Sequence, residues 1–480
     1  MRAALFVAAA MLAGCALKAP PTHTDVVEQA LPKETRIPPS WRADSRGGEV
    51  TNGWLKSFDD PTLEAIVFEA IANNLDLKAT LPRIELARSQ VLLAQSSLYP
   101  SVNVRAGASR SRESQTTALT AGFPPIGASN DYSVGLDMSY ELDVWGKYRS
   151  GALAAGNDLA ASRYYRETTR ITVAADVASA YFRLRAADAL LLVFEETRKT
   201  RMDTVSLQQD RFDSGIIGEY DLRQAEAELA AVIGDIARAR QAIGLTEGAL
   251  ATLTGRSPRA VFTPDVARGA SIDAATGVPQ LPSGLPSGLL ERRPDIRRSE
   301  AELAASDLRI QQARADYFPD LTLTGALGTE SAAFSTLFTS PATFWRFGFA
   351  LVQPILNLKS IDANVTAATA RRDSVTVQYQ QTVQNAFREV HDALVTHTSA
   401  QDVLVAETRR RDLLTEALAV ANLRYEAGRT SYLEVLDAQR TLLASETLRI
   451  GAARDARISI VDFAKSLGGG WDQEKYAASY

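Results

Sequence analysis

Two long stretches without proline are the feature that most constrains the fold of this chain. No proline occurs from Ile126 to Ser257, and none follows Pro354. Helical patterns at 147–213 and 359–427 lie within these stretches, each about 65 residues long and therefore roughly 100 Å long as α-helix. A globular core cannot cover helices of that length, so we expect them to line up side by side as a bundle or a tube.

The chain also repeats itself. The segment RFDSG at 211–215 recurs as RYEAG at 424–428, which is 213 positions later. The segment LYPSV at 98–102 is matched by YFPDL at 317–321, which is 219 positions later. These matches indicate two copies of one long unit rather than a solenoid of short repeats.

The two copies and their flanking segments define the predicted organisation. A signal peptide (1–14) and a tether (15–60) precede the first copy at 61–268, a linker at 269–288 leads to the second copy at 289–470, and a tail (471–480) follows. Each copy is expected to contain two strands and two long helices. The predicted strands are at about 98–110, 131–143, 319–330 and 343–355, and the helices at 147–213, 219–255, 359–427 and 431–467.

The predicted strands have two different faces. From Asp131 to Glu141, apolar side chains alternate with polar or small ones, which indicates a strand with one apolar face and one polar face. Asp137, Ser139 and Glu141 lie on the polar face. About ten tilted residues are enough for a strand to cross a membrane, while a soluble sandwich with one wet face is the alternative.

Four strands cannot close a barrel, and open strand edges are not tolerated in lipid. If the strands cross a membrane, several chains must therefore combine them. Two chains would give eight strands and three would give twelve, and the pattern itself leaves both open.

The N-terminus indicates export and lipid attachment. It begins MRAALFVAAAMLAGC, with one basic residue and a short apolar run, which is typical of a signal peptide and too short for a stable membrane anchor. The segment LAGC at 12–15 resembles the lipobox of bacterial lipoproteins. That resemblance implies cleavage before Cys15 and attachment of diacylglycerol and acyl groups to it, whereas an ordinary secretory signal is the alternative. The proline-rich residues that follow are expected to form an extended tether.

Composition argues against several functions. The formal net charge is -5, and no run of consecutive basic residues occurs, so a nucleic-acid partner is not expected. The chain has three histidines and one cysteine, which leaves few routes to a metal site or a His-based catalytic relay. We therefore predict no enzyme activity, no metal and no cofactor other than the lipid groups on Cys15.

A charge cluster lies just after the second repeated RxxxG segment. Gly428 marks a turn between two helices, and Glu434, Asp437 and Arg440 follow on one face of the second of them. The simplest interpretation is a solvated helix face with an Asp437 to Arg440 pair, worth about 0.2 to 0.5 kcal/mol.

Three segments carry a resemblance to a known family. They are ELD at 141–143, LLERRPDI at 289–296 and YLEVLDAQR at 432–440. These are similar to signature segments of the TolC/OprM-like outer-membrane efflux proteins, in particular the lipoprotein (NodT-type) branch. The resemblance covers essentially the whole mature chain, including the duplication.

The resemblance implies a fold that is mainly α with a transmembrane β-barrel. Three chains would each give four strands to one 12-stranded β-barrel in the outer membrane, and their helices to a long α-helical periplasmic barrel with a mixed α/β equatorial belt. It implies an exit duct of a tripartite pump that conducts small molecules such as drugs. Its implied partners are a periplasmic adaptor and an inner-membrane resistance-nodulation-division transporter.

The resemblance also implies functional residues. Leu433, Glu434, Asp437 and Arg440 align with residues that constrict the resting pore, and Tyr425 matches a tyrosine at the helical tip. In the barrel, the polar face with Asp137, Ser139 and Glu141 would line the lumen. Two other functions remain open at this stage: an outer-membrane channel of a type I protein secretion system, and a periplasmic coiled-coil scaffold without a pore.

Overall fold

The computed structural model describes residues 25, 30–31, 53–112, 114, 127–263, 265–272 and 288–469. The predicted signal peptide and tail lie outside these residues, as does most of the predicted tether and linker. The chain forms two compact units. One includes Ile84–Ser162 and Ser299–Tyr379, and the other includes Lys33–Arg83, Arg163–Arg298 and Gln380–Tyr480. Each unit thus takes segments from both copies of the repeat, so the copies are not separate domains.

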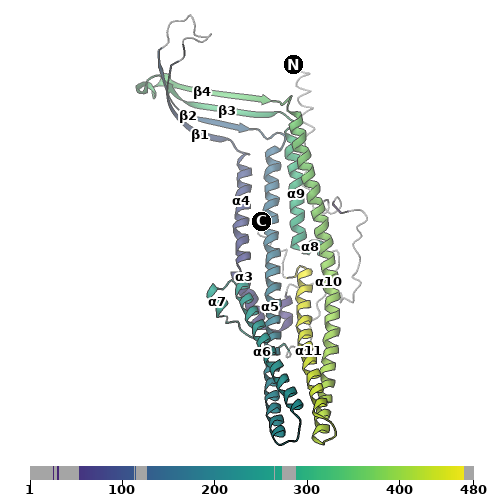
Figure 1. Ribbon diagram of the computed structural model, residues 1–480. Helices are drawn as coiled ribbons and strands as arrows, with labels where there is room; N and C mark the ends of the chain where they lie inside the picture. Colours follow the sequence, from purple (N-terminus) through teal and green to yellow (C-terminus); the bar gives the residue numbers. More distant parts are fainter. Residues whose placement is uncertain are drawn as a thin grey trace. The chain divides into compact units, whose positions relative to one another are not determined.

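The first unit contains one antiparallel sheet with strand order β1-β2-β3-β4 (Figure 1). Its strands are β1 (Ser101–Ser111), β2 (Ser129–Glu141), β3 (Asp320–Ser331) and β4 (Thr343–Val352). Every strand of the described residues belongs to this sheet, so strands of the expected α/β belt are not among them. Among the residues that the structure describes, the outer edges of β1 and β4 have no strand partner.

The strand register separates the side chains into two faces. Val104, Leu136, Leu327 and Trp345 form one row across the four strands and are all exposed. The next row is polar or small: Asn103, Asp137, Ala326 and Arg346. Because a row of exposed apolar side chains crosses this face from strand to strand, the sheet needs an apolar environment on that side.

Four long helices are the largest elements of the described residues. They are α5 (Lys147–Asp213), α6 (Glu219–Leu253), α10 (Leu358–Glu426) and α11 (Tyr432–Ser466). Each boundary lies within two residues of the position expected from the sequence. None of the helices in the described ranges is long and apolar enough to span a membrane.

Shorter helical segments connect these elements. They are η1 (Trp54–Phe58), α3 (Pro61–Asn73), α4 (Leu75–Ser96), α7 (Pro258–Phe262), α8 (Gly288–Arg292), α9 (Pro294–Ala315), η2 (Phe334–Thr336) and η3 (Ser340–Ala342).

The core of the second unit corrects the predicted end of the tether. Trp54 is buried in the main apolar cluster, together with side chains of α3, α5 and α11. Asp60 caps α3 by accepting hydrogen bonds from the backbone N–H groups of Thr62 and Leu63, at 3.0 and 3.1 Å. Tyr181 of α5 donates its hydroxyl to Asp60 at 2.6 Å. The segment 53–60 is therefore part of the folded core, and a tether reaching residue 60 was wrong.

The predicted linker also begins too early. The backbone N–H of Gly269 donates to the hydroxyl of Tyr181 at 3.0 Å, and Ile272 is buried in an apolar cluster. Burial and the neighbouring Asp60 raise the pKa of Tyr181, so this hydroxyl stays protonated and keeps the contact. Residues 269–272 thus belong to the core rather than to a linker.

Candidate functional site

The candidate site lies at the tips of two helical hairpins. The first hairpin consists of α5, α6 and the turn between them, and the second consists of α10, α11 and the turn between them. Both turns use a glycine with positive φ, 71° at Gly215 and 69° at Gly428. Ile216 N–H donates to Arg211 O and Arg429 N–H donates to Arg424 O, both at 2.8 Å. These are Schellman-type helix ends, which explains why the same RxxxG pattern occurs in both copies.

Glu434 is held within the second hairpin. Arg424 Nη1 donates to Glu434 Oε1 at 2.6 Å, and the Thr430 hydroxyl donates to the other carboxylate oxygen. These contacts join the end of α10 to the start of α11. Because both charged side chains are substantially exposed, the ion pair stabilises the turn by less than about 1 kcal/mol.

Arg440 joins the two hairpins. Its Nε donates to Glu228 Oε1 of α6 at 2.7 Å, and its Nη2 contacts the same oxygen. The hydrogen bond that Arg440 donates to Glu228 is the main cause of the raised pKa of Arg440. Arg440 thus pairs with the first hairpin, and the ion pair with Asp437 considered from the sequence is not formed.

A buried arginine supports this bridge. Arg201 of α5 is almost fully buried, lies 3.7 Å from Glu228 Oε2 and donates to Gln439 Oε1. Glu228 therefore lies between two guanidinium groups from different helices. We call Arg201, Glu228, Gln439 and Arg440 the hairpin bridge. Nothing in the sequence pattern connects Glu228 with Arg440, because they are 212 positions apart.

Leu433 and Asp437 lie on the opposite side of α11 from its packed side chains. Leu433 is 53% exposed and Asp437 is also exposed, whereas Val435 and Leu436 are buried. Among the residues that the structure describes, the Asp437 carboxylate has no hydrogen-bond or ion-pair partner. An exposed leucine beside an unpaired carboxylate is available to another chain.

Tyr425 contacts the first hairpin. Arg211 Nη1 donates to the Tyr425 hydroxyl, and the Arg211 guanidinium carbon lies 5.4 Å from the centre of the tyrosine ring. The ring of Tyr432 is 6.0 Å from that of Tyr425. The partner of this tyrosine is thus the arginine of the RxxxG segment in the other copy, which the sequence repeat contains but does not identify as a contact.

The predicted lumen residues lie in the other unit, on the polar face of the sheet. Asp137 pairs with Arg105 of β1, whose Nε is 3.0 Å from the carboxylate. Glu141 accepts the Tyr148 hydroxyl at 2.6 Å. Ser139 shares this face by alternation along β2. Cys15, the predicted lipidation site, lies outside the described residues.

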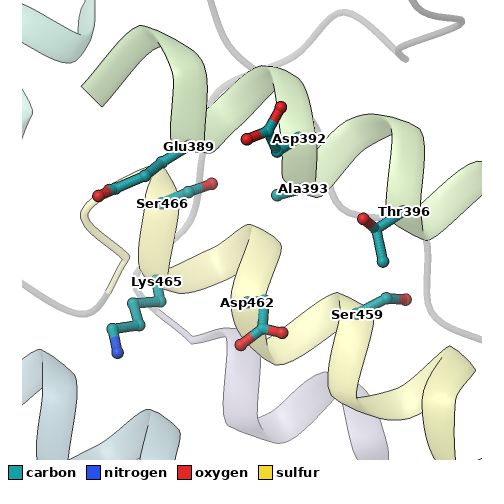
Figure 2. Close-up of a pocket in the computed structure, with 8 residues that line it drawn as sticks. All are labelled: Glu389, Asp392, Ala393, Thr396, Ser459, Asp462, Lys465 and Ser466. Carbon is teal, nitrogen blue, oxygen red and sulfur yellow. The ribbon is translucent and has the colours of Figure 1, made fainter. Parts of the chain in front are cut away.

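A cavity of about 350 Å³ between α10 and α11 was not expected from the sequence (Figure 2). Its lining residues are Glu389, Asp392, Ala393, Thr396, Ser459, Asp462, Lys465 and Ser466.

The cavity contains a serine beside a histidine, but their hydrogen bonds do not make a nucleophile. Ser459 donates its hydroxyl proton to Ala456 O at 2.7 Å, so Nδ1 of His397 is the donor in its 3.0 Å contact with Ser459. A serine that receives a hydrogen bond from histidine is not activated by it. Within the described part of the chain, no group of three or more His, Cys, Asp or Glu side chains is placed to hold a metal ion.

Comparisons with known proteins agree with this geometry. The family model described as outer membrane efflux protein matches residues 66–256 and 285–469. The chain is 31% identical over 476 residues to the probable efflux pump outer membrane protein TtgC of Pseudomonas putida, covering 98% of this chain and 96% of that protein. It is 30% identical over 461 residues to the probable outer membrane lipoprotein SilC of Salmonella typhimurium, covering 96% and 97% of the two chains.

A solved structure shows the same fold. The CmeC outer membrane channel of Campylobacter jejuni aligns with a TM-score of 0.86 and 28% identity, over 94% of this chain and 96% of that one. The predicted fold class, mainly helical with four strands per chain, is thereby confirmed. The matched ranges cover most of both copies of the repeat, and the chain therefore belongs to the outer membrane efflux protein family.

Proposed function

We propose that this chain is the outer-membrane exit duct of a tripartite efflux pump. The observation that carries the proposal is the family match over both copies, because both hairpins and all four strands fall within it. As an outer membrane efflux protein, the chain is located in the outer membrane and extends into the periplasm. In the proposed pump it conducts small molecules passively, and an adaptor and an inner-membrane resistance-nodulation-division transporter deliver them.

The proposed assembly is a homotrimer. The exposed apolar face and the two unpaired edges of the sheet support pooling of strands, because open edges are not tolerated in lipid. Three chains give a barrel of 12 strands, with Asp137, Ser139 and Glu141 on the wall of its lumen.

The proposed gate is formed by Leu433 and Asp437 at the second hairpins. In a trimer, three Asp437 carboxylates about 6 Å apart would repel each other by roughly 3 kcal/mol per pair at an effective dielectric of 20. A closed ring therefore needs countercharge from the adjacent chain. Among the described residues the Asp437 carboxylate forms no hydrogen bond or close ion pair within its own chain, which supports such a contact.

The hairpin bridge and the Arg211 to Tyr425 contact are the proposed latch. They connect the second hairpin to the first, so the second cannot move outward until they break. Glu434 stiffens the second hairpin through Arg424 and Thr430. In this proposal, the adaptor and the pump compete for these contacts and thereby open the duct.

Cys15 is the proposed attachment site for lipid, and the similarity of the chain to the probable outer membrane lipoprotein SilC supports it. We expect an intact mass increased by diacylglycerol and acyl groups in the mature protein. In Cys15→Ser this increase is absent and the signal peptide is retained. An unmodified wild-type mass would refute lipidation while leaving the channel proposal intact.

A photo-crosslinking amino acid at Arg429 tests the proposed partners. Arg429 is exposed at the turn of the second hairpin, and the matched position in the first hairpin is Ile216, which is also exposed. We expect capture, in intact cells, of the adaptor of a resistance-nodulation-division pump. Capture of an adaptor of an ABC-type secretion system would instead assign the chain to protein export.

A further inference from the structure

A second cavity, which we call the hairpin cavity, lies beside the hairpin bridge. Its volume is about 560 Å³, and its lining comes from α5 of the first hairpin and from α10 and α11 of the second. Arg201 and Gln439 of the hairpin bridge form part of this lining. Small-molecule sites commonly occupy about 300–1,000 Å³, so the cavity is large enough for one. A molecule bound here would contact both hairpins at once.

One part of the hairpin cavity is apolar. Half-buried aliphatic side chains from all three helices line it: Val193, Leu418, Leu442 and Leu443. Val193 and Leu443 also pack on buried apolar clusters, which hold them in position. Apolar ligand atoms that cover these side chains leave water, and this favours binding. The wall therefore suits a ligand with an apolar body.

Most of the charge in the lining is already compensated within the chain. Arg201 is held in the hairpin bridge. Arg411 Nε lies 2.8 Å from the Asp412 carboxylate. Glu446 accepts a hydrogen bond from Arg449 Nη2 at 2.7 Å. These three lining groups therefore offer little net charge to a ligand.

Glu196 and three threonines offer acceptors instead. Glu196 is exposed and lines the cavity, and no side chain of the described ranges forms a hydrogen bond or an ion pair with its carboxylate. The hydroxyls of Thr197, Thr200 and Thr415 each donate to the backbone oxygen four residues earlier, at 2.8, 3.3 and 2.9 Å. A hydroxyl whose proton is already used can only accept from a ligand. These groups therefore call for a ligand that donates hydrogen bonds and carries positive charge.

We propose that the hairpin cavity binds an amphipathic organic cation, a molecule with one ammonium group on an apolar ring or chain. The ammonium group donates to Glu196 and to the threonine oxygens, and the apolar part covers Leu418 and Leu442. An ammonium group has donors and no acceptor, which matches this part of the lining. A neutral molecule of the same shape would gain no charge pairing from Glu196.

The hairpin cavity lies on the side of α11 opposite the proposed gate. At about 100° per residue, Leu442 is about 180° round the helix from Leu433. A bound cation would therefore not occupy the pore. It would instead hold α5 against α10 and α11 and thereby stabilise the closed hairpins. This effect rests on the proposed function, whereas the binding site itself does not.

The binding test is equilibrium dialysis of the purified full-length chain with two probes of one shape. The first probe, 1-naphthylmethylamine, carries an ammonium group at neutral pH, and the second, 1-naphthalenemethanol, carries a hydroxyl in its place. We expect the amine to bind about threefold more tightly, as for an exposed ion pair, and Glu196→Gln to abolish this preference. Glu195→Gln is the matched control that keeps it, because Glu195 pairs with Arg198 and Arg240 and is not part of the lining.

A further variant tests the position of the site. Thr415 is an exposed residue of the lining, so Thr415→Trp fills the cavity without disturbing the core. We expect it to abolish saturable binding of both probes. Undiminished binding to Thr415→Trp would overturn the site. Equal affinity of the wild type for the two probes, or a preference for the amine that survives in Glu196→Gln, would overturn the assignment of a cation.

Recordings in planar bilayers test the effect on the hairpins and separate it from the proposed function. A ligand at about three times its Kd that binds only the closed state favours that state about fourfold per site. We therefore expect the amine to lower the conductance of Asp437→Ala by at least that factor, and to have no effect when Glu196→Gln is added. Binding without a fall in conductance would overturn the effect on the hairpins. Binding to a chain that never conducts would overturn the proposed function and leave the site in place.

Discussion

Arg440→Ala and Glu228→Gln are each expected to raise the resting conductance of the purified chain in planar bilayers by roughly a hundredfold. Each substitution breaks the ion pair that joins α11 to α6. A partly exposed pair contributes about 1 kcal/mol, and three chains opening together would lose about 3 kcal/mol, which corresponds to that factor. Asp437→Ala is also expected to raise conductance, through loss of its contact with the adjacent chain.

The control for this result is Arg223→Ala. Arg223 is an exposed arginine of the first hairpin, and its partners Glu219 and Glu226 are on its own helix. Its removal leaves the contact between hairpins unchanged, so we expect conductance like that of the wild type. Unchanged conductance in Arg440→Ala, Glu228→Gln and Asp437→Ala would rule out the proposed latch.

Gly255→Ala is expected to prevent assembly of the stable trimer. Gly255 ends α6 with φ of 66°, which disfavours any residue with a Cβ by about 1 kcal/mol. An added Cβ would also overlap the backbone carbonyl of Asn73 at the end of α3. The adjacent Asn74 donates its amide to Leu253 O at 2.8 Å, so neither backbone segment can move freely. The total cost is about 3 kcal/mol or more.

Gly215→Ala is the matched comparison. Gly215 has φ of 71° and the same place after a long helix, but its Cβ would meet no atom within 4 Å. Only the conformational cost of about 1 kcal/mol remains, so we expect trimers in near-normal amounts. The measurement is the yield of heat-modifiable trimer from outer membranes. Equal yields from the two variants would show that the contact with Asn73 does not limit assembly.

The long elements could be predicted from the sequence because each has a strong local signal. Alternation of apolar and polar residues in 131–141 gives a strand with two faces, and absence of proline permits helices of the length observed for α5 and α10. Gly215 and Gly428 gave the positions of both turns. The duplication also extends to strand pairing, since its two shifts carry the register of β1 and β2 onto the observed register of β3 and β4.

The contacts between hairpins could not be predicted in this way. Exposed helices carry many arginines and carboxylates, and no local pattern identifies Glu228 as the partner of Arg440. The duplication does not help here, because the positions of the first copy that match Glu434, Asp437 and Arg440 are Asp221, Gln224 and Ala227. The early end of the tether did have a signal: Asp60 followed by Pro61 is a typical start of a helix.

Current recordings from the purified wild-type chain test the central claim most directly, because they ask whether this chain forms a pore that is closed at rest. The full-length protein is inserted into planar bilayers and compared with Arg440→Ala. We predict small, discrete current steps from the wild-type trimer and much larger ones from the variant. If neither protein conducted, although both were present as heat-modifiable trimers, the assignment as an exit duct would be contradicted.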